Sequence, residues 1–402
     1  MSYEVREFIK NNWDSCIKEN TKTDGTLIGM PYPYTVPAVG HFDEMYYWDT
    51  YFTNKGLEIE GRYEQARNNT DNMLFLIGKF GYMPNGNRTY YLNRSQPPFL
   101  SLMVRDVYEH YNDKEWLKNA YKGLKAEYRF WTSRRGSPVG LSHYDYESSI
   151  YDHTGMANGF VHRAGFRPEG IAEYRLGRHF ASTAESGWDI TPRFGYEGYN
   201  CAAVDLNSLL YMLEKNLEFF AEELGNGESE EWGRYAEERK FCMNRYMLNE
   251  DGLFVDYNFA STTQSKIFSV ASIYPLFAGL ATKEQAEAVV KNLDRLEAEY
   301  GMLTCEKNDA EGTYQWDYPN GWACLQYITI MGLDKYGYRE EAHRIANKYV
   351  TLVDKVFAET GNLWEKYNVV EGNINVSNEY KMPAMMGWSA GTYLAALEYL
   401  KN

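Results

Sequence analysis

The sequence predicts an all-α fold of paired helices, and three observations support this prediction. Long amphipathic stretches recur along the chain, with apolar residues at helical spacing. Strand signals are sparse, and residues 252–257 give the clearest pattern of a short hairpin strand. No Pro- or Ser-rich linker divides the 402 residues, so we expect one domain over residues 1–402. About a dozen helices without a break fit either an α/α toroid or a solenoid.

The clearest helical segments alternate with loops rich in Gly, Pro, Asn and aromatic residues. These segments are residues 62–80, 97–111, 114–134, 203–224, 230–248, 283–300, 339–357 and 386–400. Gly81, Gly136 and Gly301 come after three of them and mark expected helix ends. Pro97 and Pro98 suit the first turn of a helix. The loops should gather at one end of the molecule, where binding sites usually lie.

Composition and charge exclude several classes of protein. The net charge of −15 disfavours nucleic acids and anionic membranes as partners, because both attract basic surfaces. No apolar run approaches the roughly 18 residues of a membrane span, and the first residues lack a signal-peptide pattern. We therefore expect a cytoplasmic protein. The five scattered cysteines contain no C-x-x-C pair and indicate neither zinc nor a disulfide framework.

Five loop segments mix Trp or Tyr with Asp, Glu, Asn, Gln or Arg. They are residues 40–51, 84–98, 166–189, 315–322 and 364–367, the last with Glu379 and Tyr380 beyond it. A sugar site needs aromatic faces for the ring and planar polar groups for hydroxyls. Each segment alone could be a capped turn over an apolar anchor. Five of them, in a chain with 16% aromatic residues, favour a carbohydrate pocket.

At these segments the sequence resembles the trehalases, which are inverting hydrolases built on six inner and six outer helices. Residues 39–49 resemble the family's segment ending in Tyr-Tyr-Trp-Asp, and residues 84–98 resemble its Pro-Asn-Gly to Arg-Ser-Gln-Pro-Pro segment. Arg-Pro-Glu is found at residues 167–169 and Glu-Ser-Gly-Trp-Asp at 185–189. The Gln-Trp-Asp-x-Pro-x-Gly-Trp pattern spans residues 315–322, and Glu-Lys-Tyr spans 365–367. These matches run in the same order over nearly the whole chain.

The resemblance implies an (α/α)6 barrel with long loops that form the active site at one end. It implies that Asp189 is the general acid and Glu365 the general base. It also implies a set of substrate-binding positions: Phe42, Tyr46, Trp48, Asp49, Asn85, Arg94, Gln96, Arg167, Glu169, Gly187, Gln315, Trp316 and Glu379. The expected substrate is a small carbohydrate, and no cofactor or metal is expected. The sequence does not predict an oligomeric state.

The chemistry of inverting hydrolysis requires such a pair of carboxyl groups, independently of the family resemblance. One acid protonates the leaving oxygen, and a carboxylate on the opposite face activates water, at a separation of roughly 6.5–9.5 Å. Trp188 is an apolar neighbour that would desolvate Asp189 and raise its pKa. The alternative for Asp189 is a helix cap or a salt bridge to Arg193.

Several positions depart from the trehalase pattern, so the sequence does not predict which leaving group the substrate carries. His41 stands where the family has Arg, Asn368 where it has Asp, and Cys324 where Pro is usual. Residues 376–378 replace a glycine-rich loop before Glu379. Hydrolysis of α,α-trehalose to two glucoses is the first hypothesis. The second is another small α-glucoside or α-mannoside, such as glucosyl- or mannosyl-glycerate. The third is an inactive sugar-binding helical scaffold.

Overall fold

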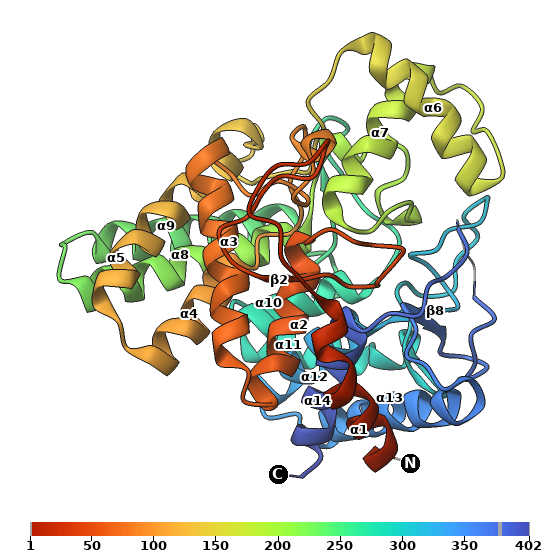
Figure 1. Cartoon of the computed structure of the whole chain (residues 1–402). Helices are drawn as coiled ribbons and strands as arrows, with labels where there is room; N and C mark the ends of the chain where they lie inside the picture. Colours follow the sequence, from red (N-terminus) through yellow and green to blue (C-terminus); the bar gives the residue numbers. More distant parts are fainter. Residues whose placement is uncertain (1, 377–379, 402) are drawn as a thin grey trace.

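The computed structural model describes residues 2–376 and 380–401, and α-helices dominate it (Figure 1). The α-helices are α1 (Ser2–Asn12), α2 (Tyr47–Ile59), α3 (Tyr63–Phe80), α4 (Leu100–Tyr111), α5 (Lys114–Arg129), α6 (Ile150–Ala164), α7 (Glu173–Ser186), α8 (Val204–Leu224), α9 (Ser229–Tyr246), α10 (Tyr274–Ala278), α11 (Lys283–Lys291), α12 (Ala323–Lys335), α13 (Arg339–Thr360) and α14 (Gly387–Tyr399).

The strands are short and join loops in antiparallel pairs. They are β1 (Ile17–Lys18), β2 (Tyr34–Thr35), β3 (Cys201–Ala202), β4 (Tyr257–Asn258), β5 (Thr263–Gln264), β6 (Glu297–Ala298), β7 (Gly301–Met302), β8 (Asn320–Trp322) and β9 (Lys366–Asn368). β1 pairs with β2, β6 with β7 and β8 with β9, while β3, β4 and β5 form one three-stranded sheet. The β8–β9 pair helps to shape the pocket described below, because Trp322 at the end of β8 and Glu365 directly before β9 line it.

Six helices form a closed inner ring. α2, α4, α8, α10, α12 and α14 each contact the next helix in this order, and α14 returns to α2. Most residues of α2, α12 and α14 are buried, because these helices have neighbours on all sides. α1, α3, α5, α9, α11 and α13 bury one face and form the outer layer. The predicted (α/α)6 barrel is confirmed.

Helices α6 and α7 form a hairpin that stands away from the inner ring, at the end of the molecule opposite the two termini (Figure 1). The hairpin has a small apolar cluster of its own, which includes Phe160, Leu176, Ile190 and Tyr314. The prediction of one domain over residues 1–402 stays a prediction. Among the described residues, no helix combines the length and apolar character that a membrane crossing requires.

Most predicted helices form close to their expected bounds, and the segment 283–300 is the main exception. The helix α11 ends at Lys291, and the chain then turns into the β6–β7 hairpin. Glu297 forms ion pairs with Arg344 and Lys348 of α13, so tertiary contacts outweigh local helix propensity here. Gly301 therefore lies in a strand and not at a helix end. The expected strand at 252–257 overlaps β4 only at residue 257.

Candidate active site

A pocket with a volume of about 260 Å³ opens at the N-terminal ends of the inner helices. Trp48 and Asp49 lie in the first turn of α2, Gln96 precedes α4, and Trp322 is the N-cap of α12. Predicted residues that line the pocket are Phe42, Tyr46, Trp48, Asp49, Asn85, Arg94, Gln96, Gly187, Asp189, Gln315, Trp316 and Glu365. Its size suits a small ligand.

Tryptophan rings from four parts of the chain form the wall of the pocket. Trp316 stacks on Trp322 with ring centroids 3.7 Å apart and an interplanar angle of 3°. Trp188 also stacks on Trp316, with ring centroids 5.5 Å apart, and the ring of Trp48 lies 5.6 Å from that of Trp316. Trp388 meets Trp316 edge-on at 6.3 Å. Such a wall offers apolar faces to a sugar ring and keeps water away from nearby carboxyl groups.

The turn at the end of α7 places Asp189 in the pocket. Gly187 ends the helix with a φ of 73°, and a Cβ at this position would lie 2.8 Å from the ring of Trp48. Only glycine suits both the left-handed backbone and this close approach. The buried Ile190 also has a positive φ, of 44°, which is strained for a β-branched residue. The backbone on both sides of Asp189 is thus held in unusual geometry.

The environment of Asp189 favours its protonated form. Burial raises the pKa of Asp189, while the guanidinium groups of Arg163 and Arg94 partly oppose this and the charge of Glu365 adds to it. Arg163 Nη1 lies 3.4 Å from Asp189 Oδ2. The alternative of a salt bridge between Asp189 and Arg193 is wrong, because the Arg193 guanidinium pairs with Asp205 and Asp256.

Glu365 lies directly before β9 and lines the same pocket as Asp189. Its side chain is only 4% exposed. Lys366 Nζ donates to Oε2 at 2.7 Å, and the Tyr380 hydroxyl donates to Oε1 at 2.5 Å. Trp388 Nε1 donates to the backbone carbonyl of Glu365 at 3.0 Å. The carboxylate is therefore fixed on both oxygens and from its own backbone.

Asp49 is a third carboxyl group in the pocket, and it is buried. Burial raises the pKa of Asp49 to about 8, and the charges of Glu365 and Asp189 contribute to this increase. A carboxyl group that stays protonated near neutral pH can donate a hydrogen bond to a ligand oxygen as well as accept one.

Polar side chains around the carboxyl groups have unused hydrogen-bonding capacity. The Arg94 guanidinium lies over the rings of Tyr91 and Tyr146, at 4.9 and 5.7 Å from their centroids. Within the described residues, Arg94 Nε and Gln315 Oε1 are buried without hydrogen-bond partners. Gln96 Oε1 accepts from the backbone of Trp48 at 3.3 Å. Unpaired buried polar groups cost free energy unless a ligand or water satisfies them.

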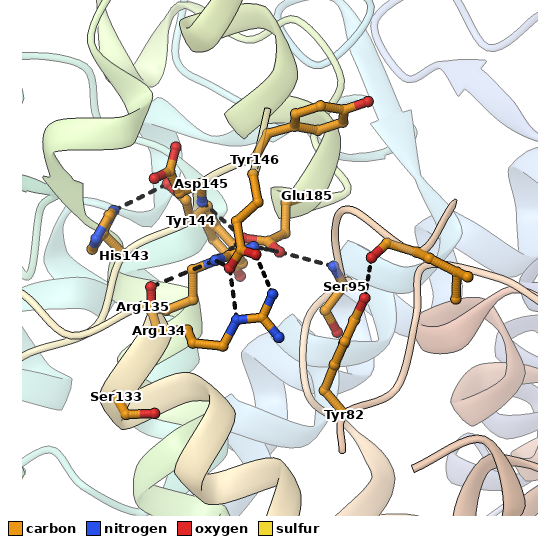
Figure 2. Close-up of polar contacts among 12 residues, drawn as sticks. Tyr82, Ser95, Ser133, Arg134, Arg135, His143, Tyr144, Asp145, Tyr146 and Glu185 are labelled. Atoms are coloured by element: carbon orange, nitrogen blue, oxygen red, sulfur yellow. Dashed lines mark hydrogen bonds and ion pairs between the residues drawn. The ribbon is translucent and has the colours of Figure 1, made fainter. Parts of the chain in front are cut away.

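A buried ion pair behind the pocket connects its loops (Figure 2). Arg135 Nε and Nη2 donate to the two carboxylate oxygens of Glu185 at 2.7 and 2.8 Å. The backbone N–H of Ser95 donates to the same carboxylate at 2.8 Å, and that of Asp145 at 2.7 Å. Ser95 lies between Arg94 and Gln96 in the sequence. The shape of the pocket wall therefore depends on Glu185, a residue of the predicted motif with no predicted contact to the ligand.

Three predicted site residues are not among those that line the pocket. Arg167 and Glu169 are exposed, and Arg167 contacts Glu173 and Asn158 instead of the pocket. The physical reason is their position in the loop between α6 and α7, beyond the hairpin residues that face the pocket. Glu379 lies outside the described residues, so the structure does not describe its predicted role.

Other residues line the pocket without having been predicted. They are Pro37, Tyr91, Arg163, Ala184, Trp322, Tyr380 and Trp388. Tyr91, Trp322 and Tyr380 belong to the aromatic segments that marked the site in the sequence, so a less selective choice would have included them. Arg163 gave no such signal, because a basic residue in the last turn of a helix is expected on electrostatic grounds alone.

The arrangement can perform acid–base chemistry on a sugar. Two carboxyl groups from distant parts of the chain line one pocket: Glu365 is buried, and Asp189 is half-buried with a raised pKa. The aromatic wall excludes water from the bond to be cleaved. Within the described residues, no group of three or more His, Cys, Asp or Glu side chains is placed to hold a metal ion.

Comparison with known proteins agrees with this chemistry. The sequence profile of the trehalase family matches residues 3–401. The chain belongs to the trehalase family. A periplasmic trehalase of Xanthomonas campestris is 32% identical, over 98% of this chain and 73% of the relative. As a member of this family, the chain is a glycoside hydrolase.

Solved structures support the same assignment. The neutral trehalase of Saccharomyces cerevisiae has a TM-score of 0.80 and 30% identity, covering 98% of this chain and 80% of the yeast chain. A mannosylglycerate hydrolase from Thermus thermophilus has a TM-score of 0.69 over 97% of this chain and 99% of the other. At 17% identity, the second likeness shows the fold alone.

The comparison overturns one expectation. The predicted cytoplasmic location is wrong, because the curated relatives from several bacteria are named periplasmic trehalases. The prediction depended on the pattern of the first residues, and that pattern does not decide where a trehalase acts.

Proposed function

We propose that this protein hydrolyses α,α-trehalose to two glucose molecules with inversion, using Asp189 as general acid and Glu365 as general base. The observation that carries the proposal is the placement of both carboxyl groups in one aromatic pocket with different surroundings. The pKa of Asp189 is raised by burial, so this group can hold a proton for the leaving oxygen. Glu365 accepts a hydrogen bond from the Lys366 ammonium group at 2.7 Å, so its carboxyl group is held in place in the pocket.

In the proposed reaction, Asp189 donates its proton to the glycosidic oxygen as the bond to the anomeric carbon breaks. Glu365 removes a proton from a water molecule, whose oxygen attacks the same carbon from the opposite face. The cleaved glucose lies against Trp48 and Trp316, and Asp49 and Gln96 bind its hydroxyls. The other glucose leaves past Arg94 and Arg163, the two cations beside Asp189.

A glycerate-linked sugar is the second candidate, and one observation favours it. Arg94 and Arg163 both act electrostatically on Asp189, so two guanidinium groups lie where the leaving group would be. Such a pair suits a carboxylate as well as sugar hydroxyls. We rank trehalose first, because the relatives with 32% and 30% identity over 98% of this chain are trehalases, whereas the mannosylglycerate hydrolase is 17% identical.

The test is to incubate the enzyme separately with trehalose, glucosylglycerate and mannosylglycerate and to follow the anomeric protons by NMR. Inverting hydrolysis of trehalose releases one α-glucose and one β-glucose in the first minutes. Release of α-glucose alone would contradict inversion. Cleavage of a glycerate-linked sugar with intact trehalose would assign the second function, and no turnover of any sugar would favour a binding scaffold.

A further inference from the structure

We propose that Lys366 is a positioning residue for Glu365, which keeps this carboxylate ionised and sets the direction of its free lone pairs. The inference rests on the proposed function of Glu365 as the base. Lys366 follows Glu365 directly in the sequence, and its side chain is 0% exposed. Lysine is seldom fully buried unless it is paired, so its position at the proposed base requires a reason.

The ammonium group of Lys366 has few polar neighbours. Among the described residues, its hydrogen-bond partner is Glu365 Oε2, at 2.7 Å. The ring of Trp322 lies 4.7 Å from Nζ and the ring of Tyr380 lies 5.0 Å from it. Aromatic faces attract a cation, but they do not replace water or a counter-ion. The charge of Lys366 therefore depends on the charge of Glu365.

This dependence works in both directions. If Glu365 takes up a proton, Lys366 is left as a buried cation without a charged partner, which is strongly unfavourable. The folded structure consequently opposes protonation of Glu365. A general base acts only in its ionised form, so the buried pair raises the fraction of molecules that are ready to activate water.

Other groups near Glu365 act in the opposite direction. Asp49 on α2 and Asp189 after α7 are carboxyl groups that interact with Glu365, and Cys324 on α12 is a buried thiol that does so. The Tyr380 hydroxyl acts in the same direction as Lys366, because it donates a hydrogen bond to the carboxylate, but it carries no charge. Lys366 is thus the cation in direct contact with Glu365 in a cluster of acidic groups.

The pair also restricts the geometry of the carboxylate. Lys366 pairs with Trp322 in the β8–β9 ladder, so the backbone beside Glu365 is fixed against the tryptophan wall. Lys366 occupies one acceptor position on Oε2 and Tyr380 occupies one on Oε1. A carboxylate has about four such positions, so each oxygen keeps one for the water that attacks the sugar.

The experiment compares wild type with Lys366→Met and Lys366→Arg. Methionine has a similar length and no charge, and arginine retains the charge. Lys335→Met is the control, because Lys335 is an exposed lysine at the C-terminal end of α12 that donates to the backbone carbonyl of Phe277 and lies away from the pocket. Thermal unfolding verifies that each variant is folded. If Lys366→Met does not fold, Lys366→Gln is measured in its place.

Two readouts are required. Carbon-13 NMR of proteins with labelled glutamate carboxyl groups follows the protonation of Glu365, identified by the signal that Glu365→Gln lacks. The pH profile of kcat/KM with trehalose follows its function. In Lys366→Met, we expect the Glu365 signal and the acid limb of the profile to move together by about one to three pH units toward higher pH. Lys366→Arg and Lys335→Met should keep both near their wild-type positions, and KM should change less than kcat.

The outcomes separate this inference from the proposed function. An unchanged Glu365 signal and an unchanged acid limb in folded Lys366→Met would overturn the role of Lys366, whatever the substrate. A shifted signal in Lys366→Met, together with a wild-type enzyme that does not cleave trehalose, would support the coupling and refute the substrate. A loss of kcat without any change in pH dependence would mean that Lys366 acts only through packing, and it would also overturn the proposal.

Discussion

Replacing Arg135 by methionine should destabilise the protein strongly, because it leaves Glu185 as a buried carboxylate without its cation. The two side chains are 1% and 0% exposed, and both guanidinium contacts to Glu185 are shorter than 3 Å. Breaking a buried pair by removing one partner typically costs about 3–5 kcal/mol. The backbone N–H groups of Ser95 and Asp145 still bind Glu185, so we expect about 4 kcal/mol and not a larger loss.

This loss corresponds to a measurable change in melting temperature. With an unfolding entropy of roughly 2.1 cal/mol/K per residue, a chain of this length has a total of about 0.8 kcal/mol/K. A loss of about 4 kcal/mol should therefore lower Tm by roughly 5 °C. Differential scanning calorimetry gives Tm directly. Trehalose turnover below the melting transition should show a higher KM, because Ser95 holds the segment with Arg94 and Gln96.

The control is Arg234→Met, which breaks an exposed ion pair. Arg234 and Glu238 are 57% and 58% exposed, and such surface pairs contribute about 0–1 kcal/mol. This variant should melt within roughly 1 °C of wild type. A melting temperature of Arg135→Met equal to that of the control would refute the reasoning, because it would mean that Glu185 is protonated or solvated in the folded protein.

The remaining predictions concern catalysis, pH and metals. Asp189→Asn and Glu365→Gln should each lower kcat by roughly 10²–10⁴-fold with unchanged unfolding, and wild-type turnover by either folded variant would exclude its assigned role. Burial raises the pKa of Glu127 to about 7, so the folded protein keeps a proton that the unfolded chain releases above about 4.5. The free energy of unfolding should therefore fall as the pH rises from about 4.5 to about 7. Glu127→Gln removes this loss, so its Tm relative to wild type should be higher at pH 8 than at pH 4. An equal difference in Tm at both pH values would contradict the raised pKa of Glu127. Turnover should be unaffected by a chelator, and activity lost in chelator and restored by a divalent metal would contradict the assignment.

The fold was predictable because helical periodicity is repeated over many segments. The helix expected at residues 62–80 forms as α3, and its end at Gly81 has the left-handed conformation that the glycine suggested. The prediction of a helix over residues 283–300 was wrong in its second half. Leu293 and Leu296 are good helix formers, but they are buried in the core from the turn that leads into the β6–β7 hairpin and not from a helix. Periodicity detects apolar spacing, and it does not detect ion pairs with a distant helix such as α13.

The candidate site was predictable where function requires unusual residue mixtures in loops. Trp48, Asp49 and Trp316 lie in such mixtures, and all three line the pocket. Arg163 is absent from any such segment, and its approach to Asp189 depends on how the α6–α7 hairpin meets the barrel. Arg167 has the right motif, but its loop directs it to Glu173 at the surface. A motif therefore fixes which residues are present, whereas the packing of the hairpin decides which of them reach the ligand.

The residue beside each carboxyl group explains how one pocket can hold an acid and a base. Asp189 follows Trp188, a fully buried ring that removes water and favours the neutral acid. Glu365 precedes Lys366, a fully buried cation that favours the charged carboxylate. The two groups also interact, so ionisation of Glu365 further raises the pKa of Asp189. The charge provided by Lys366 therefore supports both proposed roles: it holds Glu365 as a carboxylate, and that carboxylate helps Asp189 to retain its proton.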